Sequence, residues 1–167
     1  ILLQAGKPVL SDFGIALAVG VAVGGRLSET GLSLGTPHYM SPEQATGDLS
    51  VGAATDVYAL GCVLYEMLVG DPPHTGSTAQ AILGKIVMGD ADAVTKHRKS
   101  VPANVEAAIR KALEKVPADR FGGAQDFAKA LSDPGFRYGE GAAVAAGGSA
   151  DRWKPIAMMM MLLAGGL

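Results

Sequence analysis

The chain has 167 residues, 49% of them hydrophobic, which is long enough for one domain with a real core. Its formal net charge of −2 and pI of about 5.9 argue against a large basic surface for nucleic acid. The single cysteine, Cys62, excludes an internal disulfide and any multi-cysteine metal site.

Residues 1–11 are expected to form a small β-hairpin. Residues 1–3 and 9–11 are short apolar runs, and residues 4–8 have the composition of a turn. The chain starts with Ile rather than Met, and it begins as if inside a strand. We therefore expect a piece of a longer protein, with the hairpin delivering Asp12 to a cleft.

Residues 12–43 carry the most informative pattern. The segment begins with Asp12-Phe13-Gly14, in which a carboxylate suited to a hard cation stands close to a residue that lets the backbone turn. Residues 35–43 close it with Gly-Thr-Pro-His-Tyr-Met-Ser-Pro-Glu. Between these motifs, residues 14–36 show little charge and no clear period. A long irregular segment of this kind is typical of a functional loop.

The remainder of the body is expected to be helical. Residues 55–69 are apolar on nearly every face, which is typical of a helix at the centre of a domain, with Thr55 or Asp56 as its cap and Gly70 at its end. A shorter amphipathic helix is expected over residues 78–88, and another from Pro102 until Pro117. A last helix would bury one face made of Ala124, Phe127, Ala128 and Leu131.

The last part of the chain changes composition. Residues 133–154 are rich in Gly and Ala and suggest a flexible linker, whereas residues 155–167 contain no charge. As a helix, this tail would rise roughly 20 Å, short of a hydrocarbon core of about 30 Å. It is either an apolar end that docks on its own domain or the first part of a membrane span. Residues 152–154, Arg-Trp-Lys, match a cytoplasmic interface and favour the span.

The motifs at the two ends of residues 12–43 resemble the D-F-G and A-P-E signatures that bound the activation segment of a protein kinase. Ser41 stands where the family more often has Ala. The sequence of residues 35–44 is similar to that of bacterial, eukaryotic-like (Hanks-type) serine/threonine kinases.

Three further stretches resemble the same family. Residues 55–68 look like the central helix of the kinase C-lobe, residues 70–74 like the turn that follows it, and residues 112–121 like the late K-x-P-x-x-R-F box. The four boxes occur in the family's order, within residues 1–132. Chance assembly of such an ordered set is not a reasonable alternative.

The resemblance implies a mainly α fold, namely a kinase C-lobe made of a short β-hairpin and a helical bundle. Residues 1–132 would be the C-lobe part, residues 133–154 a juxtamembrane linker and residues 155–167 the truncated start of a transmembrane helix. The family's Gly-rich loop, strand lysine, paired helix Glu and H-R-D catalytic loop do not occur in these 167 residues. We therefore expect the N-lobe to be missing and the apolar hairpin to be exposed.

The resemblance also implies roles for five residues. Asp12 would hold Mg²⁺ against the phosphates of ATP, where the alternative is an ordinary turn aspartate. Thr36 would contact the catalytic loop and support a hydroxyl acceptor. Glu43 and Arg120 would form a buried ion pair that ties the segment to the base of the C-lobe, rather than being unrelated surface charges. Asp56 would accept backbone N–H groups of the catalytic loop or act as a plain N-cap.

Ser28 and Thr30 are candidate phosphorylation sites, because bacterial relatives often carry phosphorylated threonines in this part of the segment. A phosphate would add a charge of about −1.5 to −2 and could order the loop against basic residues. Leu17 stands where relatives often have a basic residue, which leaves Arg26 as a substitute partner. The alternative is that these hydroxyls only keep the loop soluble.

The function that follows is a serine/threonine protein kinase, anchored in the bacterial cell membrane with its kinase domain on the cytoplasmic side. Its partners would be ATP with Mg²⁺, proteins with Ser or Thr acceptors, the membrane and, as an open alternative, a second copy of the complete protein. The 167 residues alone are expected to be inactive. The competing hypothesis is a pseudokinase-type module that binds proteins without phosphotransfer.

Overall fold

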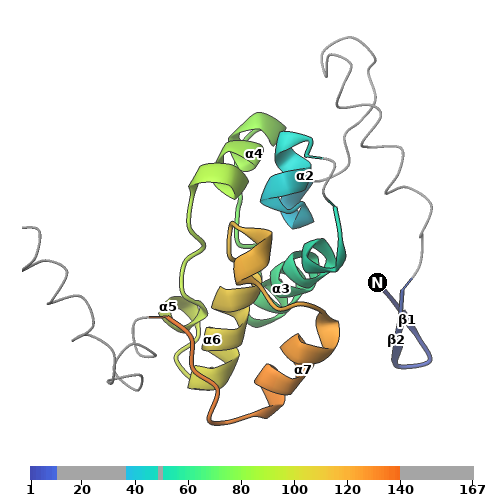
Figure 1. The fold of residues 1–167 in the computed structure, drawn as a ribbon, viewed down its shortest axis with the longest axis vertical. Coiled ribbons are helices and arrows are strands. Elements are labelled where there is room, and N and C mark those ends of the chain that lie inside the picture. Colours follow the sequence, from blue (N-terminus) through green and yellow to red (C-terminus); the bar gives the residue numbers. More distant parts are fainter. Residues whose placement is uncertain (11–36, 49–50, 140–167) are drawn as a thin grey trace, which may run out of the picture.

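The structure is a computed structural model that describes residues 1–10, 37–48 and 51–139. Figure 1 shows a helical body and, apart from it, a two-stranded hairpin. The strands β1 (Leu2–Gln4) and β2 (Lys7–Val9) are antiparallel, with Leu2 opposite Val9. Ala5 and Gly6 both have positive φ angles, 50° and 76°, as the two central residues of a type I′ hairpin turn require. The turn is thus shorter than predicted, and the second strand begins at Lys7 rather than at residue 9.

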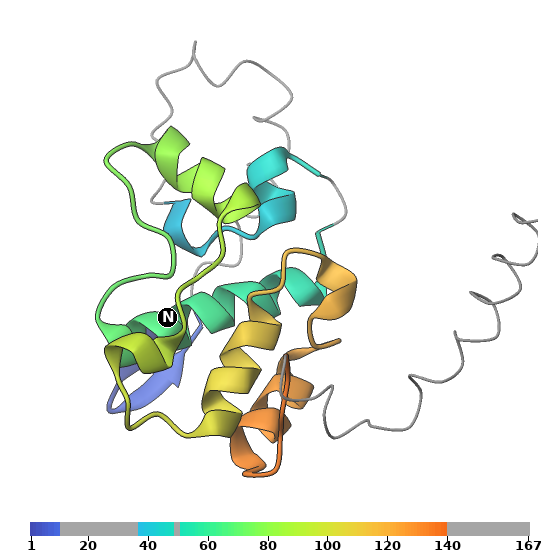
Figure 2. The ribbon, with the colours of Figure 1, turned by 90° about the vertical axis from the view of Figure 1, so that its left-hand side faces the viewer.

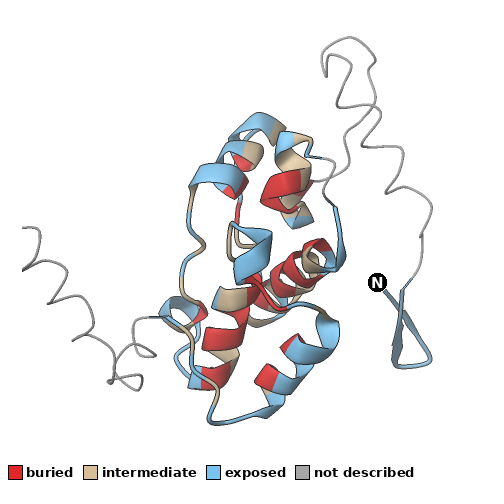
Figure 3. Ribbon diagram, in the orientation of Figure 1, coloured by how far each residue is buried: buried red, intermediate tan, exposed pale blue. Residues whose placement is uncertain are grey.

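The hairpin does not form a packed interface with the helices that the structure describes. Every residue from 1 to 10 is exposed, and the side chain of Leu3 is among the most exposed large apolar groups, with 78% of the residue accessible (Figure 3). A two-stranded hairpin is marginally stable by itself. Its apolar side chains are therefore free to contact another surface, as the sequence predicted.

Helix α3 (Ala53–Val69) lies at the centre of the helical body (Figure 2). It begins two residues earlier than predicted, because Gly52 is the N-cap and donates its N–H to Oγ1 of Thr55 at 3.3 Å. The prediction that Thr55 or Asp56 caps the helix is therefore wrong. Gly70 ends it in the left-handed conformation, with φ at 99°. The helix is not buried on every side, since Met67 is 73% exposed.

Helices α6 (Ala103–Ala112) and α7 (Ala124–Ser132) complete the core around α3. Gly61 of α3 meets α6 so closely that a Cβ atom there would lie 3.0 Å from Cβ of Ala112. Ala108, Ile109 and Ala112 on one face of α6 are buried in the core. The helix nevertheless ends at Ala112, and Pro117 begins the short 3₁₀ helix η2 (Pro117–Asp119).

The predicted buried face of α7 is partly wrong. Phe127 is buried as expected, whereas Ala124 and Ala128 are exposed. Ala130 occupies the core position instead, and its carbonyl and that of Leu131 lie 3.5 and 2.9 Å from Nδ2 of Asn104.

A second group of short helices lies at one end of the body in Figure 1. Helix α4 (Ala79–Met88) begins at the predicted position, where Thr78 accepts the N–H of Ala81. It lies beside α2 (Pro42–Thr46) and the 3₁₀ helix η1 (Pro37–Tyr39). Neither of these, nor α5 (Val94–His97), was predicted.

Residues 133–139, the start of the predicted linker, lie against the body. The ring of Phe136 is 5.7 Å from that of Phe121. Within residues 1–10, 37–48 and 51–139, no helix has the length and apolar character needed to cross a bilayer. The predicted transmembrane start at residues 155–167 lies outside the described residues.

Candidate functional site

The short helix α2 positions the acidic residue that ends the Ser-Pro-Glu motif. Ser41 is its N-cap, and the cap is reciprocal. Ser41 donates its N–H to Oε1 of Gln44 at 3.0 Å, and Gln44 donates its N–H to Oγ of Ser41 at 3.4 Å. Pro42 suits the first helical position, and Gly47 ends the helix with φ at 74°. Glu43, in the first turn, is buried.

Glu43 and Arg120 form a bidentate ion pair in the interior. Nη1 of Arg120 donates to Oε1 of Glu43 at 2.8 Å, and Nη2 donates to Oε2 at 2.7 Å. Thr55 adds a third hydrogen bond, from Oγ1 to Oε1 at 2.7 Å. Parallel N–H···O bonds between a guanidinium and a carboxylate are strong and directional. The structure therefore brings together the two residues that the resemblance pairs.

The guanidinium of Arg120 also donates hydrogen bonds to three backbone carbonyls around it. Its Nε donates to the carbonyl of Glu114 at 2.7 Å, Nη1 to that of Ala54 at 3.1 Å and Nη2 to that of Lys115 at 3.0 Å. With the two bonds to Glu43, every one of the five N–H donors of this side chain has an acceptor. Arg120 thus joins α2, the first turn of α3 and the loop before η2.

The surroundings of Glu43 hold its carboxylate in the charged form. Burial raises its pKa, but the hydrogen bonds from Arg120 and Thr55 outweigh burial and lower the pKa from 4.5 to about 2. The ion pair is therefore intact at neutral pH. Its contribution to stability is lost only as the pH falls from about 4.5 through about 2.

Two aromatic contacts near this pair did not follow from the sequence. The ring of Tyr58 lies under Arg120, with 5.0 Å between Cζ and the ring centroid, at a distance typical of a cation–π contact. The hydroxyl of Tyr39 in η1 donates to the carboxylate of Glu66 in α3, and this bond raises the pKa of Tyr39. Together with the hydrogen bond from Thr55 to Glu43, it attaches both ends of residues 39–43 to α3.

Most other predicted site residues lie outside the described part of the chain. These are Asp12, Thr36, Ser28 and Thr30. Asp56 is described and lies exposed in the first turn of α3. Among the described residues, no group of three or more His, Cys, Asp or Glu side chains could hold a metal ion. The assignment of Mg²⁺ to Asp12 thus stays a prediction.

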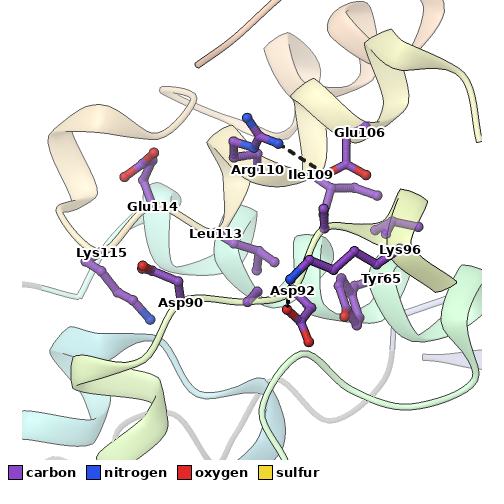
Figure 4. Close-up of a pocket in the computed structure, with 13 residues that line it drawn as sticks. Tyr65, Asp90, Asp92, Lys96, Glu106, Ile109, Arg110, Leu113, Glu114 and Lys115 are labelled. Carbon is purple, nitrogen blue, oxygen red and sulfur yellow. Dashed lines mark hydrogen bonds and ion pairs between the residues drawn. The ribbon is translucent and has the colours of Figure 1, made fainter. Parts of the chain in front are cut away.

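A pocket of about 390 Å³ opens between α3, α5 and α6 (Figure 4). Several charged side chains line it, and four of them form two ion pairs. Asp92 pairs with Lys96, and Glu106 lies 3.7 Å from Arg110 while it accepts the N–H of Thr95 at 2.9 Å. Of the predicted site residues that the structure describes, Glu43, Asp56 and Arg120, none lines it, and we assign no substrate to it.

His74, between α3 and α4, is buried and 3% exposed. Burial lowers its pKa from 6.5 to about 4, the charges of Lys115 and Lys85 act in the same direction, and Asp90 opposes them. The imidazole is therefore neutral in the folded chain at neutral pH.

We expect the free energy of unfolding to fall as the pH drops from about 6.5 to about 4, because over this range the unfolded chain binds a proton at His74 that the folded chain does not. His74→Phe should remove this part of the pH dependence in urea titrations at stepwise pH values. His97→Gln, which replaces an exposed histidine, should retain it. An unchanged slope in His74→Phe would contradict the assignment.

The central helix α3 and the buried pair of Glu43 and Arg120 are two features that the resemblance to a kinase C-lobe predicted. A family model for the protein kinase domain matches residues 1–134, and the chain belongs to the protein kinase family.

Bacterial serine/threonine kinases are among its relatives. The chain is 43% identical over 110 residues to the serine/threonine-protein kinase PknB of Mycobacterium tuberculosis (strain ATCC 25618 / H37Rv), which covers 66% of this chain and 17% of that protein. The chain is 40% identical to PknB of Mycobacterium leprae over 110 residues, which are 66% of this chain and 17% of that protein. Similarity to PknH of Mycobacterium bovis is 36% over 129 residues, 75% of this chain and 21% of that protein. The chain therefore spans about a fifth or less of the length of these relatives.

Proposed function

We propose that the chain is part of a serine/threonine protein kinase that transfers the γ-phosphoryl group of ATP to Ser or Thr hydroxyls of proteins. The observation that carries the proposal is the buried pair between Glu43 and Arg120. This pair attaches the end of residues 12–43 to the helical body, as an activation segment requires. The family match and the names of the relatives support the same activity.

The proposed roles follow the motifs. Asp12 would hold Mg²⁺, which neutralises charge on the phosphates when it is bound. Thr36 would support the acceptor hydroxyl near the catalytic loop, and Asp56, exposed at the start of α3, would accept N–H groups of that loop. Since positioning and charge neutralisation supply nearly all of the catalysis, the 167 residues without a catalytic loop would not transfer phosphate.

Ser28 and Thr30 are the proposed sites of regulatory phosphorylation. Each lies between the two motifs of residues 12–43, and Arg26 stands close in the sequence. A phosphate there would add an acceptor group of charge about −1.5 to −2 that Arg26 can pair with.

The proposed location is the bacterial cell membrane, with the kinase domain on the cytoplasmic side. Residues 155–167 contain no charge, and Arg152 and Lys154 flank them on the side of the kinase domain. Basic residues beside an apolar stretch favour the cytoplasmic side of a span.

Two measurements test the proposed activity. First, the coding sequence upstream of Ile1 should encode an H-R-D-x-K-x-x-x-N loop, whereas a loop without its Asp would favour the protein-binding module. Second, the complete product should incorporate labelled phosphate into a protein acceptor with Mg²⁺ and ATP, and the purified 167-residue chain should not. Incorporation by the 167-residue chain alone would contradict our account of its missing parts.

A further inference from the structure

Basic side chains gather at one corner of the helical body, around α5 and the end of the described C-terminal segment. We call this set the basic surface. It consists of Lys96, Arg98, Lys99, Arg110 and Arg137, and all five residues are exposed.

Two hollows on this corner connect three of these residues. Lys96 and Arg110 line the pocket of Figure 4. Arg110 and Arg137 line a second, more open hollow of about 260 Å³. Thr95 and Val101, which flank the run 96–100, line this second hollow too. Because Glu106 and Arg110 line both hollows, Lys96, Arg110 and Arg137 border one continuous surface, and Arg98 and Lys99 lie in the run between Thr95 and Val101.

The basic surface carries an excess of positive charge. The carboxylates that line the first pocket are those of Asp90, Asp92, Glu106 and Glu114, and Asp92 and Glu106 pair with Lys96 and Arg110. Within the described part of the chain, no carboxylate pairs with Arg98, Lys99 or Arg137. Three full positive charges are thus left facing solvent on a chain whose formal net charge is −2.

The segment on the C-terminal side of this surface contacts the body through Tyr138, and the segment's own backbone orients Arg137. Arg137 donates from Nη1 to the carbonyls of Pro134 and Phe136, at 2.8 and 2.7 Å. The ring of Tyr138 lies 5.2 Å from Nζ of Lys111. The guanidinium of Arg137 is therefore fixed at the rim of the hollow without being neutralised.

The continuation of the chain starts at this rim. Tyr138 lines the hollow, and residues 140–154 lead from there to the uncharged residues 155–167. Even fully extended, residues 140–154 span at most roughly 50 Å. If residues 155–167 enter a bilayer, the basic surface is therefore tethered within reach of the headgroups on the same side.

We propose that the basic surface binds the anionic phospholipid headgroups of the membrane that anchors the chain. This inference rests on the proposed membrane anchoring. An anionic leaflet attracts each nearby basic residue by about 1 kcal/mol, within a distance set by ionic screening. The helical body would then lie on the bilayer through its α5 corner.

The test is cosedimentation of the full 167-residue chain with vesicles of phosphatidylcholine alone and of phosphatidylcholine with phosphatidylglycerol. The fraction of the chain bound to neutral vesicles measures insertion of the apolar residues 155–167. The increase in the bound fraction on anionic vesicles measures the contribution of the basic surface. Arg98→Gln combined with Lys99→Gln should reduce partitioning onto anionic vesicles by about 30-fold at low ionic strength, the factor that corresponds to about 1 kcal/mol per side chain. Partitioning onto neutral vesicles should not change.

The matched control is Lys7→Gln combined with Lys129→Gln, which removes the same charge from the hairpin and from α7 and should leave the gain intact. Both variants replace exposed residues, and their thermal unfolding should match that of the parent chain. Equal partitioning of the Arg98/Lys99 variant and the control onto anionic vesicles would overturn the inference. That result is expected if the basic surface binds an acidic protein instead of lipid. Binding to anionic vesicles but not to neutral vesicles would support lipid binding by the basic surface. It would contradict the proposed membrane anchoring through residues 155–167. Binding to neither vesicle would overturn both.

Discussion

Arg120→Met is expected to destabilise the helical body by about 3 to 5 kcal/mol, because it leaves the carboxylate of Glu43 buried without its cationic partner. The same change removes the donors that serve three backbone carbonyls, those of Ala54, Glu114 and Lys115. Native domains are stable by only about 5 to 15 kcal/mol, so the loss would be a large part of the total. Urea unfolding followed by circular dichroism would measure it.

Lys129→Met is the matched control for this variant. It breaks the exposed pair between Lys129 and Asp126, whose separation is 3.0 Å, and should cost less than about 1 kcal/mol. Glu43→Gln should cost less than Arg120→Met, since an amide oxygen still accepts one of the guanidinium N–H groups. A double-mutant cycle across Glu43 and Arg120 would isolate the coupling between them. Equal losses in Arg120→Met and Lys129→Met would show that the buried pair is not a stabilising link.

Asp12→Asn in the complete protein is expected to lower the rate of phosphate transfer by a factor on the order of 10³. An amide keeps the shape of the side chain but removes the negative charge that would hold Mg²⁺, and metal charge stabilisation is worth several kcal/mol at about 1.4 kcal/mol per tenfold. Transfer of labelled phosphate to a protein acceptor would measure the effect.

The control for Asp12→Asn is Asp119→Asn, an equal change at an exposed residue of η2, which should retain full activity. Thermal unfolding of both variants should match the unchanged protein, so that a loss of activity is not a loss of fold. Full activity in Asp12→Asn would remove Asp12 from the metal site. No activity in the unchanged complete protein would favour the protein-binding module.

The sequence predicted the existence of the long helices better than their ends. Helix α3 follows from a continuous apolar stretch, but its start depends on Gly52, which has no side chain to mark a cap. In α7, Ala128 and Ala130 carry equal and weak hydrophobic signals. Only the packing against α6 decides which of them is buried, because small residues contribute little to periodicity.

The parts of the site that the sequence could not predict join residues far apart in the chain. Tyr39 and Glu66 are 27 positions apart, and no periodic pattern relates them. The pairing of Glu43 with Arg120 was expected only because the two motifs resemble those of a known family. Helix α2 could have been predicted from the sequence. Ser41, Pro42 and Gln44 together form a pattern that is typical of a helix N-terminus.

The separation of 77 positions between Glu43 and Arg120 has a consequence for the order of folding. Closing so large a loop costs more chain entropy than joining α3 to α6, so α3 and α6 should assemble first and α2 should dock later. A bond made after the rate-limiting step slows unfolding and hardly affects the folding rate. The ion pair would then slow the detachment of residues 37–48 from the rest of the helical body.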